Sequence, residues 1–289
     1  MMGLAFDSEG NLYGARYTGS KVEKITHDGV RTTFVSGLDT PNGLAFDSNG
    51  NLHVIDNQGG EILRVSPDMT VDIYVPNILS PSGIVKMPDS DTMIVSNWEG
   101  DKLVKVAPDG SLSDFVVGGG LEGSVGLAYD ENNTLYVGNY NDLWIFSISS
   151  SGNLDTLTRL NVSGNNIGFI AYRDNFIYAT IPWDNKVYKV DLDGNYELFA
   201  GSSADNTDGD ISVAKLNEPN GIIVSPGVDN LYISDFNTNS VRIISNVEDT
   251  VGTNDFIRKP TILESKIIPN PAIKETSLSF ELIESYFYF

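Results

Sequence analysis

The sequence repeats one phrase six times, and this periodicity constrains the fold more than any other feature. The segment GLAFDSEGNLY at residues 3–13 returns as GLAFDSNGNLH at residues 43–53. Weaker copies begin at Gly83, Gly126, Gly168 and Gly221. Successive copies therefore start 40 to 53 residues apart. A period in this range indicates a repeat architecture, in which each repeat is one small unit and the variable loops gather on one face.

The second repeat has the pattern of four short strands. Residues 43–47 are mostly apolar, as in a buried strand, and an Asn-Gly turn separates them from residues 52–56. Residues 61–65 and 71–75 alternate polar and apolar side chains, which is typical of half-exposed strands. Four antiparallel strands that grade from buried to exposed describe a propeller blade. We therefore predict an all-β fold, a six-bladed β-propeller of four-stranded antiparallel blades.

The predicted propeller occupies residues 1–258, with blades that start near residues 3, 43, 83, 126, 168 and 221. Blade six has three clear strands but no obvious fourth. Either Asp255–Arg258 supplies this strand, or an N-terminal strand outside this chain once closed the ring, which leaves blade six incompletely closed. The chain begins inside a repeat and has no signal peptide, so we expect an upstream segment.

Composition excludes several classes of function. The formal net charge of -21 argues against nucleic acid and anionic membrane surfaces as partners, because both require basic patches. No apolar stretch is long enough for a membrane helix, so membrane insertion is not expected. The chain has no cysteine, which excludes disulfides and thiol catalysis. Its only two histidines are His27 and His53, so a three-histidine metal site is also excluded.

Several segments carry a family resemblance. AKLNEPNGI at residues 214–222, NLYISD at residues 230–235 and the NSVRI that follows resemble NHL repeats. PNGIIVSP at residues 219–226 is also similar to the gluconolactonase and senescence-marker-protein family. Both resemblances imply a six-bladed propeller. They are specific for the fold and weak for activity, because one propeller scaffold serves many functions. Propeller lyases of the NHL and streptogramin-lyase types need several histidines, which this chain does not have.

The last residues break the period and suggest a separate tail at residues 259–289. IIPNPA at residues 267–272, followed by TSLSFEL at residues 276–282, resembles the start of the C-terminal sorting domain of Bacteroidetes type IX secretion. This resemblance implies an extracellular or cell-surface protein with a truncated sorting domain. The alternative is a proline linker followed by a terminal strand.

One set of candidate residues stands directly before or at the start of the first strand of each repeat. We call these the leading residues: Met2, Asn42, Ser82, Val125, Ile167 and Asn220. The gluconolactonase resemblance implies a divalent metal near this rim, with Asn42 and Asn220 matching the Asn of its Pro-Asn-Gly motif. Two amide oxygens alone make a poor site for calcium or another hard cation, which prefers several oxygens with negative charge. A further carboxylate such as Glu99 or Glu122 would be needed. Asn before Gly can also simply form a turn.

A second set follows the second strand of each repeat. We count from one equivalent residue in the second strand of each repeat: Tyr13, His53, Ile94, Tyr136, Tyr178 and Tyr232. Four residues later, or five in the fifth repeat, five blades have an aromatic side chain and one has an amide: Tyr17, Asn57, Trp98, Tyr140, Trp183 and Phe236. The preceding positions are mostly polar: Arg16, Asp56, Asn97, Asn139 and Asp235. Aromatic rings beside hydrogen-bonding groups around a central opening suit a glycan or peptide ligand. The alternative is that these rings pack between blades.

The acidic loop at residues 205–210 is a third candidate. DNTDGD places three carboxylates and an amide within six residues, a composition that can bind calcium. It lacks the downstream Glu of an EF-hand, and Asp-Gly at this place is also an ordinary feature of NHL repeats.

Three functions remain open from the sequence. The first is a secreted or surface binding module for a glycan, peptide or protein, with its site on the aromatic-polar face. The second is a metal-dependent lactone hydrolase of the gluconolactonase type. The third is a structural spacer in a larger surface protein.

Overall fold

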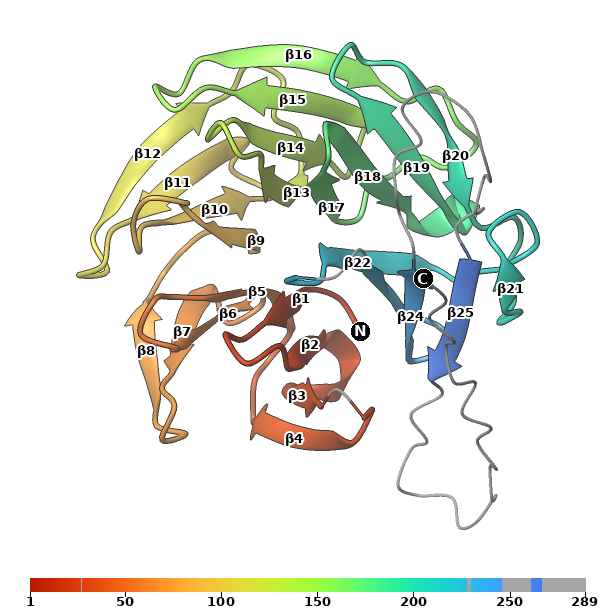
Figure 1. The fold of residues 1–289 in the computed structure, drawn as a ribbon. Coiled ribbons are helices and arrows are strands. Elements are labelled where there is room, and N and C mark those ends of the chain that lie inside the picture. Colours follow the sequence, from red (N-terminus) through yellow and green to blue (C-terminus); the bar gives the residue numbers. More distant parts are fainter. Residues whose placement is uncertain (27, 228–229, 246–260, 267–289) are drawn as a thin grey trace, which may run out of the picture.

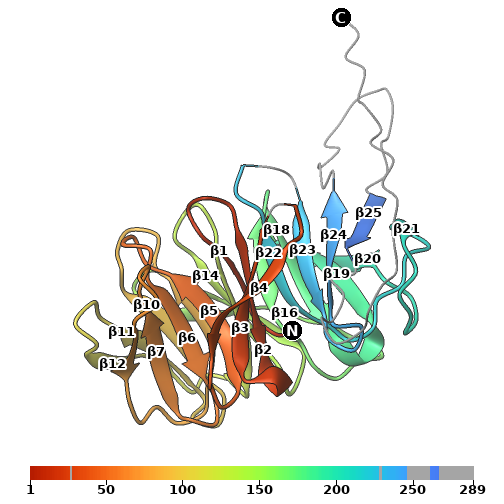
Figure 2. The ribbon, with the colours of Figure 1, turned by 90° about the horizontal axis from the view of Figure 1, so that it is seen from below.

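The computed structural model describes residues 1–26, 28–227, 230–245 and 261–266, and it is the six-bladed β-propeller that the repeats predict. Six antiparallel sheets surround a central axis, with β1, β5, β9, β13, β17 and β22 innermost (Figure 1). Turning the molecule by 90° shows neighbouring blades side by side around the ring (Figure 2). No helix within the described ranges is long and apolar enough to cross a membrane.

The first three blades contain twelve strands. They are β1 (Leu4–Phe6), β2 (Leu12–Arg16), β3 (Lys21–Ile25), β4 (Arg31–Ser36), β5 (Pro41–Phe46), β6 (Leu52–Asp56), β7 (Glu61–Val65), β8 (Val71–Val75), β9 (Pro81–Lys86), β10 (Met93–Asn97), β11 (Lys102–Val106) and β12 (Leu112–Val117). In each of these blades the order across the sheet follows the order in the chain, from the axis outward.

The other three blades repeat this plan, with one addition. Their strands are β13 (Ser124–Tyr129), β14 (Leu135–Asn139), β15 (Trp144–Ile148), β16 (Leu154–Arg159), β17 (Ile170–Arg173), β18 (Phe176–Ile181), β19 (Lys186–Asp191), β20 (Tyr196–Ala200), β22 (Pro219–Val224), β23 (Leu231–Asp235), β24 (Ser240–Ser245) and β25 (Thr261–Lys266). The short strand β21 (Gly209–Asp210) pairs with the outer side of β25. Two short 3-10 helices, η1 (Tyr17–Gly19) and η2 (Pro182–Asp184), lie between second and third strands.

The hydrophobic core lies between the blades. Each of six buried clusters joins two neighbouring blades; one, for example, packs Ala5 and Tyr13 of blade one against Leu44 and Val54 of blade two. Burial falls from the inside outward, as the apolar content of the repeat predicts: every residue of β6 is buried, whereas the first three of β8 are exposed. A blade is therefore stable only beside its neighbours, because burial of these faces supplies most of the favourable free energy.

The glycine that opens each repeat marks the place where the blades approach most closely. We call these six the ring glycines: Gly3, Gly43, Gly83, Gly126, Gly168 and Gly221. None of them has the left-handed backbone that usually calls for glycine. Instead, a Cβ atom on each would press against the next blade. On Gly83 it would overlap the carbonyl oxygen of Val125, and on Gly43 it would lie 2.6 Å from that of Ser82.

The sequence alone does not identify the fourth strand of blade six. Its fourth strand is β25, which pairs antiparallel with β24 and lies beyond the boundary expected at residue 258. Asp255–Arg258, the strand candidate from the sequence, lies outside the described residues. Within the described residues, blades one and six exchange no strand. They meet through packing, with the rings of Phe6 and Tyr232 5.1 Å apart, and through a 2.9 Å hydrogen bond from Ser234 Oγ to the Met2 carbonyl.

The close approach at the axis gives a first prediction. Gly83→Ala should lower the free energy of unfolding by about 3 kcal/mol, because the new methyl group meets rigid backbone and a blade must shift. Gly37→Ala is the control: Gly37 has a left-handed φ of 84° but no atom near its missing Cβ, so only strain of about 1 kcal/mol is expected. Urea denaturation measures both variants. Equal losses would contradict the proposed role of the ring glycines.

Candidate functional site

A cavity of about 230 Å³ lies where the first strands and the loops between second and third strands meet at the axis. Its lining residues are Met2, Tyr17, Asn42, Asn57, Ser82, Trp98, Val125, Tyr140, Gly168, Phe169 and Asn220. None of them carries a formal charge. The repeat alignment anticipated nine of the eleven, because it picked out the leading residues and the residues after each second strand.

We use the word floor for the lining residues at or beside the leading positions: Met2, Asn42, Ser82, Val125, Phe169 and Asn220. Asn42 is turned along the ring, so that its Nδ2 donates to Ser82 Oγ at 2.9 Å, while its buried Oδ1 has no hydrogen-bond partner among the described residues. The backbone carbonyl of Asn220 accepts from Thr180 Oγ1 at 2.6 Å and from the Phe169 amide at 3.0 Å. The floor therefore has a polar part and an apolar part, the latter formed by Met2, Val125 and Phe169.

The fifth repeat departs from the alignment. Gly168 and Phe169 line the cavity there, and the predicted leading residue Ile167 is fully buried in the cluster between blades four and five. The repeat is shifted because β17 begins at Ile170, after the ring glycine. The sequence carries a signal of this shift, since the aromatic Phe169 stands where the other repeats have Leu or Ile.

Four residues form the wall of the cavity, one from each of blades one to four: Tyr17, Asn57, Trp98 and Tyr140. All four are half-buried. Three of them are fixed by a repeated backbone hydrogen bond to the residue two positions before the leading residue. Asn57 donates to Thr40, Trp98 to Ser80 and Tyr140 to Gly123, at 2.9 to 3.0 Å. The Asn57 side chain also donates to the Pro81 carbonyl at 2.7 Å.

The other two aromatic candidates are placed differently. Phe236 makes the same backbone hydrogen bond, to Glu218 at 3.1 Å, but does not line the cavity. Trp183 lies on η2 with 60% of its surface exposed, outside the cavity lining. The wall residues therefore come from blades one to four, and blades five and six contribute only Gly168, Phe169 and Asn220 to the lining.

None of the five polar residues before these positions lines the cavity. Both carboxylate oxygens of Asp56 accept from backbone amides, those of Asp39 and Thr40, at 2.8 and 2.7 Å. Asn139 accepts from Ser124 Oγ and donates to the Gly120 carbonyl. These groups hold the loop that leads into their own blade.

The remaining three polar residues are also turned into the protein. Arg16 faces Glu23, with 3.8 Å between Nη1 and Oε2, and Asp235 accepts from the Asn217 amide at 2.7 Å. Asn97 is buried, and its Oδ1 has no hydrogen-bond partner in the described part of the chain.

The cavity residues do not fit a divalent metal site. Asn42 and Asn220 both line the cavity, but the other polar side chains there are an amide, a hydroxyl, two phenols and an indole. Among the described residues, no three His, Cys, Asp or Glu side chains form a group that could hold a metal. Glu99 and Glu122 are exposed and lie outside the lining, and Glu99 accepts a 2.7 Å hydrogen bond from Ser80. A hard cation would therefore lack the carboxylates that it prefers.

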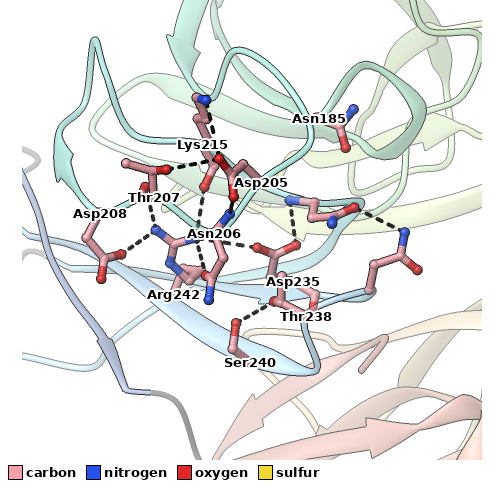
Figure 3. A network of polar contacts seen from close by, with 12 residues as sticks. Asn185, Asp205, Asn206, Thr207, Asp208, Lys215, Asp235, Thr238, Ser240 and Arg242 are labelled. Carbon is pink, nitrogen blue, oxygen red and sulfur yellow. Dashed lines mark hydrogen bonds and ion pairs between the residues drawn. The ribbon is translucent and has the colours of Figure 1, made fainter.

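The acidic loop at residues 205–210 binds the side chain of an arginine through three of its residues (Figure 3). Arg242 is fully buried and pairs with Asp208 and, at 3.5 Å, with Asp235. Its Nη1 and Nη2 donate to Asn206 Oδ1 and to the Thr207 and Lys215 carbonyls at 2.9 to 3.1 Å. The guanidinium thus supplies a positive charge beside this loop, whose composition alone could also suit calcium. Arg242 was missed there, although it lies in the NHL-like NSVRI segment.

Asp235 is the most perturbed carboxyl in this network. Burial raises its pKa from 3.8 to about 6, although Arg242 and the Asn217 amide oppose the shift by stabilising the charged form. None of the residues of this charged network lines the cavity, and all the residues that do are neutral.

Comparison with known proteins supports the fold alone. No family model matches the chain, and no curated protein sequence matches it. An auxiliary nutrient binding protein of Bacteroides ovatus superposes with a TM-score of 0.74 and 15% identity, over 86% of this chain and 69% of that one. Virginiamycin B lyase of Staphylococcus aureus gives 0.65 and 15%, over 85% and 80%. A gluconolactonase of Xanthomonas campestris gives 0.64 and 15%, over 81% and 82%. Proteins on this scaffold thus include binders and enzymes.

The raised pKa of Asp235 predicts a pH dependence. A carboxyl that holds its proton more tightly when folded favours folding at low pH, and this contribution is lost as pH rises through its folded pKa. The wild-type protein should therefore lose roughly 1 kcal/mol of unfolding free energy relative to Asp235→Asn between about pH 5 and about pH 7.5. Urea denaturation of both proteins at each pH measures the difference. A difference that does not change with pH would contradict the raised pKa.

Proposed function

We propose that this propeller is a binding module that holds a small neutral ligand, or one neutral unit of a larger ligand, in the axial cavity. The observation that carries the proposal is the lining: aromatic rings and amides converge on one cavity, and no charged side chain does. Pockets that combine apolar walls with a few placed polar groups are typical of small-molecule sites.

A sugar ring is the ligand class that this lining favours. Tyr17, Trp98 and Tyr140 offer ring surfaces for its apolar face, while Asn42, Asn57 and Asn220 offer amides for its hydroxyl groups. Blades five and six contribute no wall residue, so we propose that a longer glycan or peptide extends from the cavity toward these blades. The exposed Trp183 is then available to a longer ligand. The similarity to nutrient binding proteins agrees with this proposal.

A lactone hydrolase is the second candidate, because Asn42 and Asn220 both line the cavity and a gluconolactonase shares the fold. In such an enzyme a bound metal polarises the carbonyl group and activates water. The described residues supply no carboxylate group for that ion. Hydrolysis of glucono-1,5-lactone that depends on added divalent metal, and that is lost in Asn42→Ala, would favour the hydrolase over the binding module.

We also propose that the parent protein is exported to the cell surface. The support is the IIPNPA motif at residues 267–272, which lies outside the described residues. Protease digestion of intact cells would remove the protein if it is on the surface and would spare it if it is inside. A spacer in a larger surface protein would share this location but would bind no glycan or peptide.

The binding proposal predicts a difference between two tryptophans. Trp98→Ala should weaken binding to small sugars on a glycan and peptide array by about tenfold or more, because it removes a large ring surface from the cavity wall. Trp183→Ala is the matched control. It removes an equal side chain from outside the lining, so binding to the same small sugars should not change.

The array also separates the alternatives. If wild-type protein and Trp98→Ala give the same signals at equal concentration, the axial cavity is not the binding site. If the protein binds nothing on the array, the result would favour a role as a structural spacer over a role as a binding module.

A further inference from the structure

We infer that Gly123 is a positioning residue of the cavity, which fixes Trp98 and Tyr140 relative to each other. This inference rests on the proposed function for its biological meaning, but the geometry stands independently. Gly123 belongs to the loop that leads into blade four and does not itself line the cavity.

Gly123 contacts both aromatic wall residues. Its carbonyl accepts the backbone hydrogen bond of Tyr140 at 2.9 Å. A Cβ atom at this position would lie 2.7 Å from the indole Nε1 of Trp98 and would overlap the side-chain amide of Asn141. Real Cβ atoms do not approach other heavy atoms this closely, so the edge of the Trp98 ring occupies the space that a side chain at Gly123 would need.

Backbone conformation alone does not require glycine here. Gly123 has a φ of 63°, but the equivalent residues of blades three and six, Ser80 and Glu218, have φ values of 43° and 58° and carry side chains. They accept the same hydrogen bond, from Trp98 and Phe236 respectively. Only blade four has glycine at this position, and only there does the missing side chain make room for a tryptophan of the preceding blade.

The consequence concerns the shape of the cavity. The Asn141 side chain can turn away from a methyl group at position 123, but the indole ring is rigid, so Trp98 must also turn away or the loop carrying Tyr140 must move. Either change separates two neighbouring wall rings, one from blade three and one from blade four. Gly123 therefore sets the width of the aromatic wall against which we propose that a ligand packs.

A single-tryptophan protein can test this contact without any ligand. In a Trp144→Phe, Trp183→Phe background the fluorescence comes from Trp98 alone. Gly123→Ala should raise the acrylamide quenching constant of Trp98 about twofold, because a displaced indole is more exposed. The matched control is Gly118→Ala in the same loop, at a glycine with a similar φ of 67° but with no atom near its missing Cβ. It should leave quenching and emission unchanged.

The glycan array then links the contact to function. Gly123→Ala should lose the signals that Trp98→Ala loses, while Gly118→Ala retains them. If Gly123→Ala leaves both quenching and array binding unchanged, or if Gly118→Ala changes them equally, the inference is wrong. If quenching changes but Trp98→Ala binds normally, the contact is real and the proposed binding site is wrong.

A second comparison covers the case in which Gly123→Ala unfolds. In a Trp98→Ala background the indole edge is absent, so the same substitution should lower the thermal midpoint by less than it does in the wild type. An equal loss in both backgrounds would assign the defect to backbone strain or to the contact with Asn141, and would overturn the role of Gly123 in placing Trp98.

Discussion

The structure depends on the contact between neighbouring first strands at the axis. There the backbone of one blade comes so close to the next that no side chain fits between them, which is why each repeat opens with glycine. Gly83 faces the carbonyl of Val125, and Gly221 faces that of Met2, so the same contact also joins the last blade to the first. Hydroxyl groups reinforce it: Ser96 and Ser234 each accept from the amide of the ring glycine in their own blade. Packing between blades follows from this spacing, because it sets how closely the sheet faces meet.

Much of the fold is predictable because the period records this contact six times. The Gly-Leu-Ala-Phe phrase, the Asn-Gly turns and the outward decline in apolar content are all local features, and they predict blade number and strand order. The fourth strand of blade six is different, because β25 follows a long segment without a repeat signal. Its position in the sheet comes from pairing with the outer edge of β24, and no repeat motif in its own sequence marks it. Such long-range pairing cannot be inferred from one copy of a motif.

The candidate site is predictable in position and less so in orientation. Alignment places Tyr17, Trp98 and Tyr140 on one rim, and the structure brings them to one cavity. It cannot tell which side of a loop a polar residue faces. Asp56 and Asn139 are adjacent to wall residues in sequence, yet their side chains make hydrogen bonds to loop backbone. Asp56 accepts from the Thr40 amide, and Asn139 donates to the Gly120 carbonyl. Burial explains the outcome, since an unpaired polar group away from water is costly and nearby backbone groups are the closest partners.

Departures from the repeat, more than the repeat itself, determine what the cavity can bind. A strictly sixfold ring would have identical floor and wall residues, whereas here the floor carries amides at blades two and six and apolar groups at blades one, four and five. The wall is equally uneven, with rings from blades one, three and four and an amide from blade two. Gly123 belongs to the same class of departures, because three equivalent positions keep a side chain and it does not. The ring glycines thus serve closure of the ring, and glycine in this one loop serves the shape of the site.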